Sequence, residues 1–448
     1  MKNVIIFLLI CLSYSQLIIS QDTNKWMGTN EQKIKGLMTI WAETKFGFPH
    51  RTRLEEINWD STVQSFIPKV IEANDVESYY KILMELTALL ADSHTEIIPP
   101  WGRFIPDYDI PQIEIVVIND RFYILRTGDN DEIKKQKIYP GIEILEVNDG
   151  IPVGKYFEDN VLKYHSRGSK QANYTALLYY MLYGPKQTKV KLKIRDLNGE
   201  IKNVELSRNA NGEVGEPFFY TFIKHLFAKT IESRIQTDSV LYINLPNFEG
   251  KNKNVREDFL KMIDELELTS IKGMIIDLRY NMGGSHSIMQ PIVSCLIDEP
   301  VKAPTNHYFH YTAAYIPWQN IPAIEWDKRE LEIQPRNGKR YDGPIVLLIG
   351  PYTHSSGEDM VIELSQRKNC ITVGEPTAGG AGGKLSFPLP GGGEFNMSTF
   401  KATYPDGTEY MIKGIQPDIL IQKTLDDIVQ DNDPVLDKAV EVLKTNNL

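Results

Sequence analysis

Short apolar runs alternate with helical stripes in residues 217–448, and this alternation constrains the fold more than any other feature. Three runs are short, β-branched-rich and bounded by turn-forming residues, as buried strands are: 240–243, 274–278 and 345–349. The segments that follow them repeat apolar residues at helical spacing: 259–268, 287–296 and 360–364. Strands separated by helices predict a sheet of βαβ units.

Two regions of different character precede this one. Residues 28–100 carry apolar side chains on helical faces until two prolines end the pattern. Residues 105–208 contain strand-like runs separated by turns, including a hairpin signal at Asn119 and Asp120. The predicted fold class is α/β and multi-domain, with a signal peptide in 1–20, a helical segment in 21–100, a β-rich module in 105–210 and an α/β domain in 217–448.

The first residues have the pattern of a secretory signal peptide. A basic start at Lys2 is followed by an apolar core at residues 4–10 and by small residues, with cleavage expected near Ser20. No later apolar run reaches the length of a transmembrane helix, so we expect no stable membrane insertion. The chain is therefore expected in a periplasm or outside the cell.

Charge and cysteine content argue against a nucleic-acid partner, a disulfide framework and a zinc site. The formal net charge is −10 without a basic cluster, which disfavours a nucleic acid as partner. Beyond the signal peptide, only Cys295 and Cys370 remain, too few for a disulfide framework, and we expect both to be buried thiols. No Cys/His spacing resembles a zinc site, so the sequence implies neither a metal nor an organic cofactor.

The segment THSSGE (353–358) forms a tight turn between an expected strand and an expected helix. Ser355 and Glu358 have the spacing of a capping box. In a capping box, the hydroxyl accepts a hydrogen bond from a helix amide, and the carboxylate accepts one from the amide of the capping residue. The same turn can also expose a serine hydroxyl beside helix N-terminal amides that stabilise a developing oxyanion. The turn alone leaves both roles open.

A second turn follows another expected strand, in the segment DLRYNMGG (277–284). Amides in a Gly-Gly turn are unobstructed by β-carbons and can approach a ligand closely. Alone, this is an ordinary strand-to-helix connection. Because ligand sites gather at the carboxyl ends of strands in open α/β sheets, the two turns together indicate acyl-transfer chemistry.

Six motifs in order resemble the family of C-terminal processing peptidases and the tricorn core protease. They are DSHT (92–95), PGIEILEVNDGIPV (140–153), YINL (242–245), DLRYNMGG with THSSGE, GEPT (374–377) and GIQPD (414–418). The resemblance implies a PDZ-like module in the middle of the chain and a ClpP/crotonase-like α/β catalytic domain. It also implies a serine peptidase that acts on peptide or protein substrates without a cofactor.

The resemblance assigns roles to both turns. Ser355 corresponds to the nucleophile, and Ser356 would contribute its amide to the oxyanion hole together with Gly283 or Gly284. Glu358 is the glutamate that marks the turn. Neither assignment excludes a capping role for the same residues.

The general base separates two branches of the family. Processing proteases place a lysine where this chain has Gly380, and Lys384 is off register, so a Ser/Lys dyad is not expected. Tricorn-like members use a histidine preceded by a serine, which corresponds to Ser93 and His94. Histidine suits this role because its ordinary pKa is about 6.5.

Other histidines and the orienting acid are less well matched. His354 is expected to point away from Ser355, and His286 is the second choice for the base. The family's orienting glutamate would fall near Met411, and Glu409 is the nearest carboxylate. The chain could also be a non-catalytic binder of peptides or small ligands, or hydrolyse a non-peptide substrate; the oligomeric state does not follow from the sequence.

Overall fold

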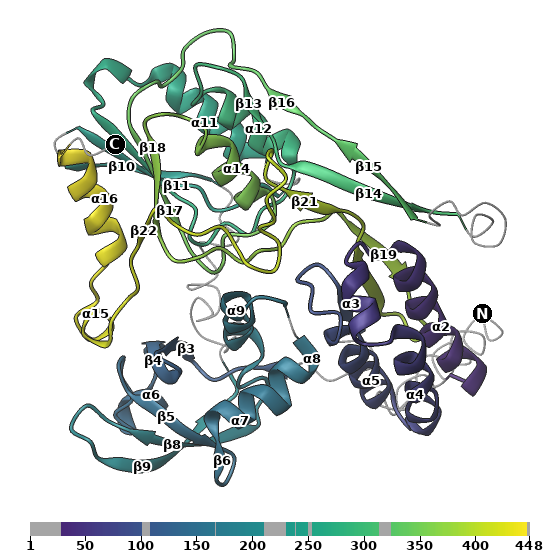
Figure 1. Cartoon of the computed structure of the whole chain (residues 1–448). Coiled ribbons are helices and arrows are strands. Elements are labelled where there is room, and N and C mark those ends of the chain that lie inside the picture. Colours follow the sequence, from purple (N-terminus) through teal and green to yellow (C-terminus); the bar gives the residue numbers. More distant parts are fainter. Residues whose placement is uncertain are drawn as a thin grey trace, which may run out of the picture.

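The computed structural model describes residues 28–100, 108–165, 167–209, 230–237, 239–249, 253–312 and 324–445. The predicted signal peptide lies outside these ranges. Figure 1 shows three regions, which we call the helical segment (28–100), the middle module (108–209) and the C-terminal region (230–445). The chain is a mixed α/β protein with several sheets, which confirms the predicted fold class.

The helical segment confirms the helical pattern seen in the sequence. Its helices are α2 (Asn30–Gly47), α3 (Arg51–Glu56), α4 (Trp59–Glu72) and α5 (Val76–Ala88). Thr29 and Asp75 begin α2 and α5 with capping boxes. The helices enclose an apolar core that includes Leu37 and Tyr79.

That core is completed by a distant part of the chain. Phe395 and Met397, on strand β20 (Glu394–Ser398), are buried within it. Strand β20 pairs with β1 (Glu96–Ile98) on one side and with β19 (Lys384–Pro388) on the other, both antiparallel. The sequence did not predict this hairpin, which joins the C-terminal region to the helical segment (Figure 1).

The middle module is built around an antiparallel sheet ordered β3-β4-β5-β8-β9, with its core on one side. The hairpin expected at Asn119 and Asp120 is present, and both residues have positive φ, 50° and 59°. Its elements are β2 (Tyr108–Asp109), β3 (Ile113–Ile118), β4 (Arg121–Thr127), α6 (Asp131–Lys135), β5 (Glu143–Val147), β6 (Ile151–Pro152), α7 (Val153–Phe157), η1 (Glu158–Leu162), α8 (Lys163–His165), α9 (Lys170–Tyr180), β7 (Gly184–Pro185), β8 (Lys189–Arg195) and β9 (Ile201–Ser207).

The C-terminal region contains the predicted βαβ sheet. Its strand order is β10-β11-β12-β17-β18-β22, and every pair except β10–β11 is parallel. The central elements are β10 (Glu232–Thr237), β11 (Val240–Asn244), α11 (Lys253–Glu265), η2 (Leu268–Ser270), β12 (Gly273–Asp277), α12 (His286–Ser294), β17 (Ile345–Ile349), α14 (Ser356–Leu364), β18 (Cys370–Gly374), β22 (Ile419–Leu420), α15 (Leu425–Gln430) and α16 (Pro434–Thr445).

Alternate strand residues of this sheet face two separate cores. One face packs with α11, α12 and α14, and the other packs with α16. Smaller strands extend from this body: β13 (Val301–Lys302), β14 (Thr305–Tyr311), β15 (Ile324–Arg329), β16 (Glu332–Ile333) and β21 (Lys401–Thr403). Because β12 and β17 run parallel with Asp277 opposite Leu348, their carboxyl ends bring the two predicted turns together.

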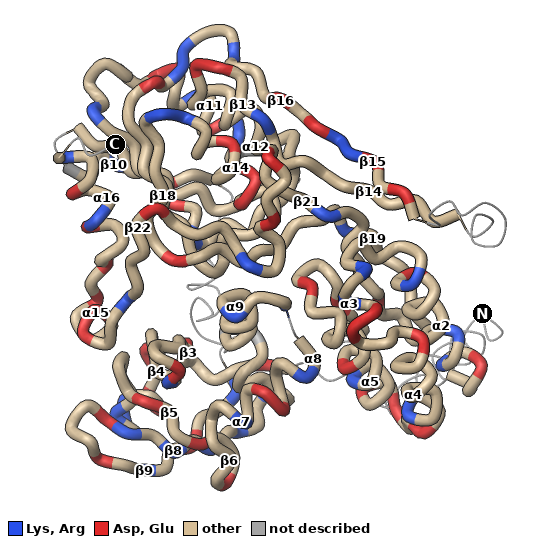
Figure 2. Tube along the Cα trace, in the orientation of Figure 1, with Lys and Arg blue, Asp and Glu red and all other residues tan. Residues whose placement is uncertain are grey.

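The charged residues and the thiols agree with the composition. Acidic and basic residues are interspersed along the trace of the three regions (Figure 2). Cys295 and Cys370 are free and buried, as expected. Among the described helices, none combines the length and the apolarity needed to cross a membrane.

Candidate active site

Ser355 lies at the turn between β17 and α14 in a conformation that non-glycine residues rarely adopt. Its φ is 55° and its ψ is −130°, and its side chain is partly exposed. A conformation of this kind persists only where the surroundings enforce it, and such residues cluster at functional sites. The Ser355 hydroxyl makes no capping hydrogen bond, so the capping box considered above is wrong.

Glu358 binds a different part of the chain. Its carboxylate accepts hydrogen bonds from the Thr377 hydroxyl, from the amide of Gly379 at 2.8 Å and from the amide of Gly380 at 2.9 Å. Burial raises the pKa of Glu358 to about 8, and these three donors oppose the rise. Glu358 therefore binds the loop of residues 377–380, which we call the glycine loop. It does not form the helix-capping hydrogen bond that its spacing from Ser355 had suggested.

The predicted oxyanion-hole residues lie beside Ser355, with one correction. The amide of Gly283 donates to Oδ1 of Asn281 at 2.8 Å and is therefore occupied. Within the described residues, the amides of Gly284 and Ser356 donate no hydrogen bond. The Ser356 hydroxyl donates to the carbonyl of Gly284 at 3.1 Å, which joins the two turns. Gly284 and Ser356 are therefore the pair of free amides at this site.

Asn281 is a structural residue of this site that the sequence analysis missed. Its side chain is fully buried, donates to the carbonyl of Leu245 and accepts from Gly283, while its own carbonyl accepts from the amide of His354 at 3.0 Å. It thereby fixes both turns relative to strand β11. Its position two residues before Gly283 is the signal that could have revealed it.

Ser93 and His94 reach the site because the segment after α5 is tied to β20. Asp92 accepts hydrogen bonds from Thr95 at 2.5 Å and from Ser398 at 2.6 Å. The pairing of β1 with β20 continues this attachment. These contacts fix the helical segment to the C-terminal region next to Ser93 and His94.

Ser93, His94 and His354 form one cluster. The Ser93 Oγ lies 2.7 Å from Nε2 of His354, and the rings of His94 and His354 stack with centroids 4.5 Å apart. His354, which the sequence analysis treated as a weak candidate, thus contacts both predicted partners of Ser355. Nδ1 of His94 is buried and has no hydrogen-bond partner in the described residues.

Gly380 leaves the space that this cluster needs. A β-carbon at position 380 would lie 2.1 Å from both Nε2 of His354 and Oγ of Ser93. The position that corresponds to the family's lysine therefore has no room for any side chain. Lys384 instead points toward Glu96, with Nζ 3.9 Å from Oε1, and is half-exposed.

Burial lowers the pKa of both stacked histidines. For His94, the charges of Lys384 and Arg167 lower the pKa further, while Asp92 and Glu96 raise it. The pKa of His354 lies well below its ordinary value, first through burial and then through the neighbouring His94. Both rings are therefore neutral near pH 7 and able to accept protons.

Two other predicted residues lie outside this cluster. Glu409 forms an ion pair with Lys401 and is half-exposed, so the structure does not bring it to His94 as an orienting acid. Nε2 of His286 lies 2.8 Å from the Asp359 carboxylate, a hydrogen bond that raises the pKa of His286. His286 is thus paired with a residue of α14, one turn beyond the serine.

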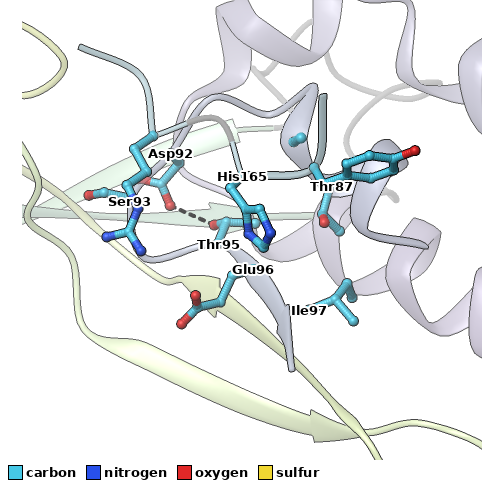
Figure 3. A pocket seen from close by; sticks show the side chains of 10 residues that line it. Thr87, Asp92, Ser93, Thr95, Glu96, Ile97 and His165 are labelled. Atoms are coloured by element: carbon cyan, nitrogen blue, oxygen red, sulfur yellow. Dashed lines mark hydrogen bonds between the residues drawn. The ribbon is translucent and has the colours of Figure 1, made fainter. Parts of the chain in front are cut away.

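Ser93 also lines a cavity of about 20 Å³. Figure 3 shows Asp92, Ser93, Thr95, Glu96 and His165 around it. This volume is enough for roughly one water molecule. In the part of the chain described, histidine, cysteine and carboxylate side chains form no cluster that could hold a metal ion.

The C-terminal region of this chain is similar to known peptidases. Residues 239–421 match the model of peptidase family S41. The carboxy-terminal processing protease CtpB of Bacillus subtilis (strain 168) is 24% identical over 316 residues, a match that covers 69% of this chain and 54% of that protein. CtpA of the same strain is 22% identical over 262 residues, covering 58% of this chain and 48% of that protein. The chain thus spans about half the length of these relatives.

A solved structure matches nearly the whole chain. Mature CPAF in complex with lactacystin superposes with a TM-score of 0.71 at 17% identity, covering 93% of this chain and 98% of that one. This likeness shows a shared fold. The family match, in turn, includes both turns that form the candidate site, Gly283–Gly284 and Ser355–Ser356. Residues 239–421 thus match peptidase family S41, and the chain is similar to carboxy-terminal processing proteases.

Proposed function

We propose that this chain is a serine peptidase whose nucleophile is Ser355 and whose general base is His94. The observation that carries the proposal is the strained turn at Ser355, whose hydroxyl caps no helix amide. A hydrogen bond joins this turn to Gly284, and within the described residues the amides of Gly284 and Ser356 are both free to bind an oxyanion. The family of residues 239–421 supports the same chemistry. The relatives named as carboxy-terminal processing proteases support a peptide or protein as substrate.

Acylation follows from the proposed roles. His94 takes the proton of the Ser355 hydroxyl while Oγ forms a bond to the carbonyl carbon of the substrate. The amides of Gly284 and Ser356 donate to the oxyanion that develops. The C–N bond then breaks, and His94 returns the proton to the leaving amine.

Deacylation uses the same groups. His94 takes a proton from water, whose oxygen attacks the acyl carbon, and the proton returns to Ser355 as the ester bond breaks. No step in this sequence needs a cofactor. His94 remains partly exposed, which is compatible with access by water and substrate.

Two further parts of the proposal concern place and architecture. We infer export, because a basic start, an apolar core at residues 4–10 and small residues form a signal-peptide pattern. We also infer that the middle module is PDZ-like, because its sequence carries a Pro-Gly turn followed by a strand and an Asn-Asp-Gly turn. Ser169, the N-cap of α9, donates to the carbonyl of Ala378 in the glycine loop (377–380) at 2.7 Å.

Hydrolysis of unstructured peptides tests the proposal against a pure binding role. Wild type should cleave a mixed peptide library, and Ser355→Ala should bind the same peptides without cleaving them. Product masses would also report the cleavage preference. Peptide binding without cleavage by wild type would show that the chain is a binder on this scaffold. Cleavage of esters but not of peptides would assign a different hydrolase activity.

A further inference from the structure

We propose that His354 is a positioning residue for the base: its ring braces His94 by stacking, and its Nε2 holds the Ser93 hydroxyl. This inference rests on the proposed function, because it concerns how His94 is oriented toward Ser355. It assigns a role to the residue directly before the nucleophile.

The need for such a residue follows from what surrounds His94. Serine–histidine networks ordinarily orient the histidine through a group that binds its second ring nitrogen. In the described residues, Nδ1 of His94 has no partner, and Glu409 is engaged with Lys401. The ring contact found for His94 is the stack with His354, at 4.5 Å between centroids and 23° between planes. Packing therefore takes the place of a hydrogen-bonded acid.

The hydrogen bonds of His354 determine which nitrogen carries its proton. A hydrogen bond with the backbone of Met282 raises the pKa of His354, which means that the imidazole donates there. Burial and the neighbouring His94 outweigh this bond and hold the pKa well below its ordinary value, so the ring is neutral. A neutral imidazole has one donor nitrogen, and Nε2 is therefore the acceptor of the Ser93 hydroxyl.

The position of His354 is fixed from three sides. Its amide donates to the carbonyl of Asn281, and its own carbonyl accepts from the amide of Gly357 at 2.9 Å. Gly380 borders the ring so closely that a β-carbon there would overlap Nε2. The side chain is buried, at 9% exposure. A ring held this firmly can restrict the rotation of its stacked neighbour.

Charged groups around the two rings come from several elements. Asp92 and Glu96 belong to the segment after α5, Lys384 begins β19, and Arg167 precedes α9. Their effects on the pKa of His94 have opposite signs, with the two acids raising it and the two bases lowering it. A change at His354 that keeps the ring neutral leaves these four charges in place.

The experiment measures the rate constant of fluorophosphonate labelling from pH 5 to 8 in full-length variants. His354→Phe keeps a flat ring but removes the acceptor, and Ser93→Ala removes the donor. We expect each to lower the rate constant by about tenfold and the double variant to be no slower than the slower single one, as for residues that act as a unit. His354→Ala, which also removes the stack, should be slower still. Thermal unfolding confirms that each variant is folded.

Gly380→Ala tests the contact between Ser93 and His354 by placing a β-carbon against it. Its β-carbon would displace Ser93 or His354, so we expect a loss of at least tenfold in the rate constant. Gly154→Ala is the matched control, because its β-carbon would meet only Phe122, at an ordinary 3.9 Å. Wild-type rate constants for folded His354→Phe and His354→Ala would overturn the inference. Independent, multiplying effects of Ser93→Ala and His354→Phe would also overturn it.

A measurement that does not depend on enzyme activity separates this inference from the proposed function. Ring ¹⁵N chemical shifts should show His354 neutral and protonated at Nδ1 at pH 7, with Nε2 shifting in Ser93→Ala. Protonation at Nε2 would overturn the inference even in an active enzyme. Failure of wild type to react with the probe would count against the proposed function, while the ring shifts would still decide the role of His354. Loss of the acid limb in His354→Phe, with its retention in His94→Ala, would make His354 the base and overturn the inference.

Discussion

The amide of Ser355 donates a 2.9 Å hydrogen bond to the carbonyl of Gly380. The amide of Gly380 in turn donates to Glu358, which lies on the helix that Ser355 begins. Helix, serine turn and glycine loop therefore form a closed set of contacts, in which the strained backbone of Ser355 is held from the opposite side. Glu358 is fully buried and therefore supports the geometry of the site from within the protein.

Glu358→Gln is expected to weaken both folding and catalysis. At pH 9, where wild-type Glu358 is ionised because its pKa is about 8, a glutamine must direct its NH₂ group toward at least one of the backbone amides that donate to the carboxylate. A buried donor without an acceptor costs about 1–3 kcal/mol. We expect the free energy of unfolding to fall by about that amount and the rate constant of fluorophosphonate labelling to fall at least tenfold. Denaturant unfolding and labelling kinetics measure the two effects. Unchanged values would show that the loop holds its position without Glu358.

Glu363→Gln, on the same helix, is expected to have the opposite effect on stability. Both carboxylate oxygens are buried without a hydrogen-bond partner in the described residues, and burial, with the nearby Asp359, raises the pKa of Glu363 well above its ordinary value. An acid with a raised folded pKa contributes most below its unfolded pKa of about 4.3, and that contribution is lost as pH rises through the folded pKa. The variant should therefore gain stability over wild type as pH increases from about 5 to 8. A gain in stability that does not grow with pH would contradict the raised pKa of Glu363.

The sequence predicted the parts of this site that depend on local pattern. Parallel strands and the two turns after them follow from apolar spacing and glycines. The roles of Ser93 and His94 follow only from the resemblance to the tricorn-like peptidases. The role of Glu358 was mistaken because its spacing from Ser355 also fits a helix cap. Local spacing does not show that Thr377, Gly379 and Gly380 return to that carboxylate from a distance in the chain.

Other contacts were unpredictable because they are long-range. The Ser93–His354 hydrogen bond joins residues 261 positions apart. The core of the helical segment includes Phe395, from a strand that no sequence pattern linked to it. Such contacts depend on the packing of three regions and leave no periodic signal in either partner.

Removal of His94 should abolish the acid limb of the pH–rate profile. A general base must be neutral, so the wild-type rate should rise with pH through the pKa of His94, which burial sets below its ordinary value of about 6.5. His94→Ala should lose at least about a thousandfold in turnover. If His94→Ala kept the acid limb and His286→Ala lost it, the general base would be His286 and not His94.

Lys384→Ala and Asp92→Asn should move that limb in opposite directions. Lys384 lowers the pKa of His94, so its removal should shift the midpoint upward while leaving maximal turnover largely intact. Asp92 raises that pKa, so neutralising it should shift the midpoint downward, and asparagine Oδ1 can still accept from Thr95 and Ser398. The pH dependence of turnover on one peptide measures both shifts. A loss of roughly a thousandfold in Lys384→Ala would revive a Ser/Lys dyad.

The central claim is that the Ser355 hydroxyl is the nucleophile, and the direct measurement is the mass-spectrometric mapping of a fluorophosphonate adduct. The account predicts a single adduct on Ser355 in wild type and none in Ser355→Ala. Ser356→Ala should still be labelled, at a lower rate, because it loses the hydrogen bond to Gly284 but keeps its own amide. An adduct on Ser356, or one that persists in Ser355→Ala, would contradict the account.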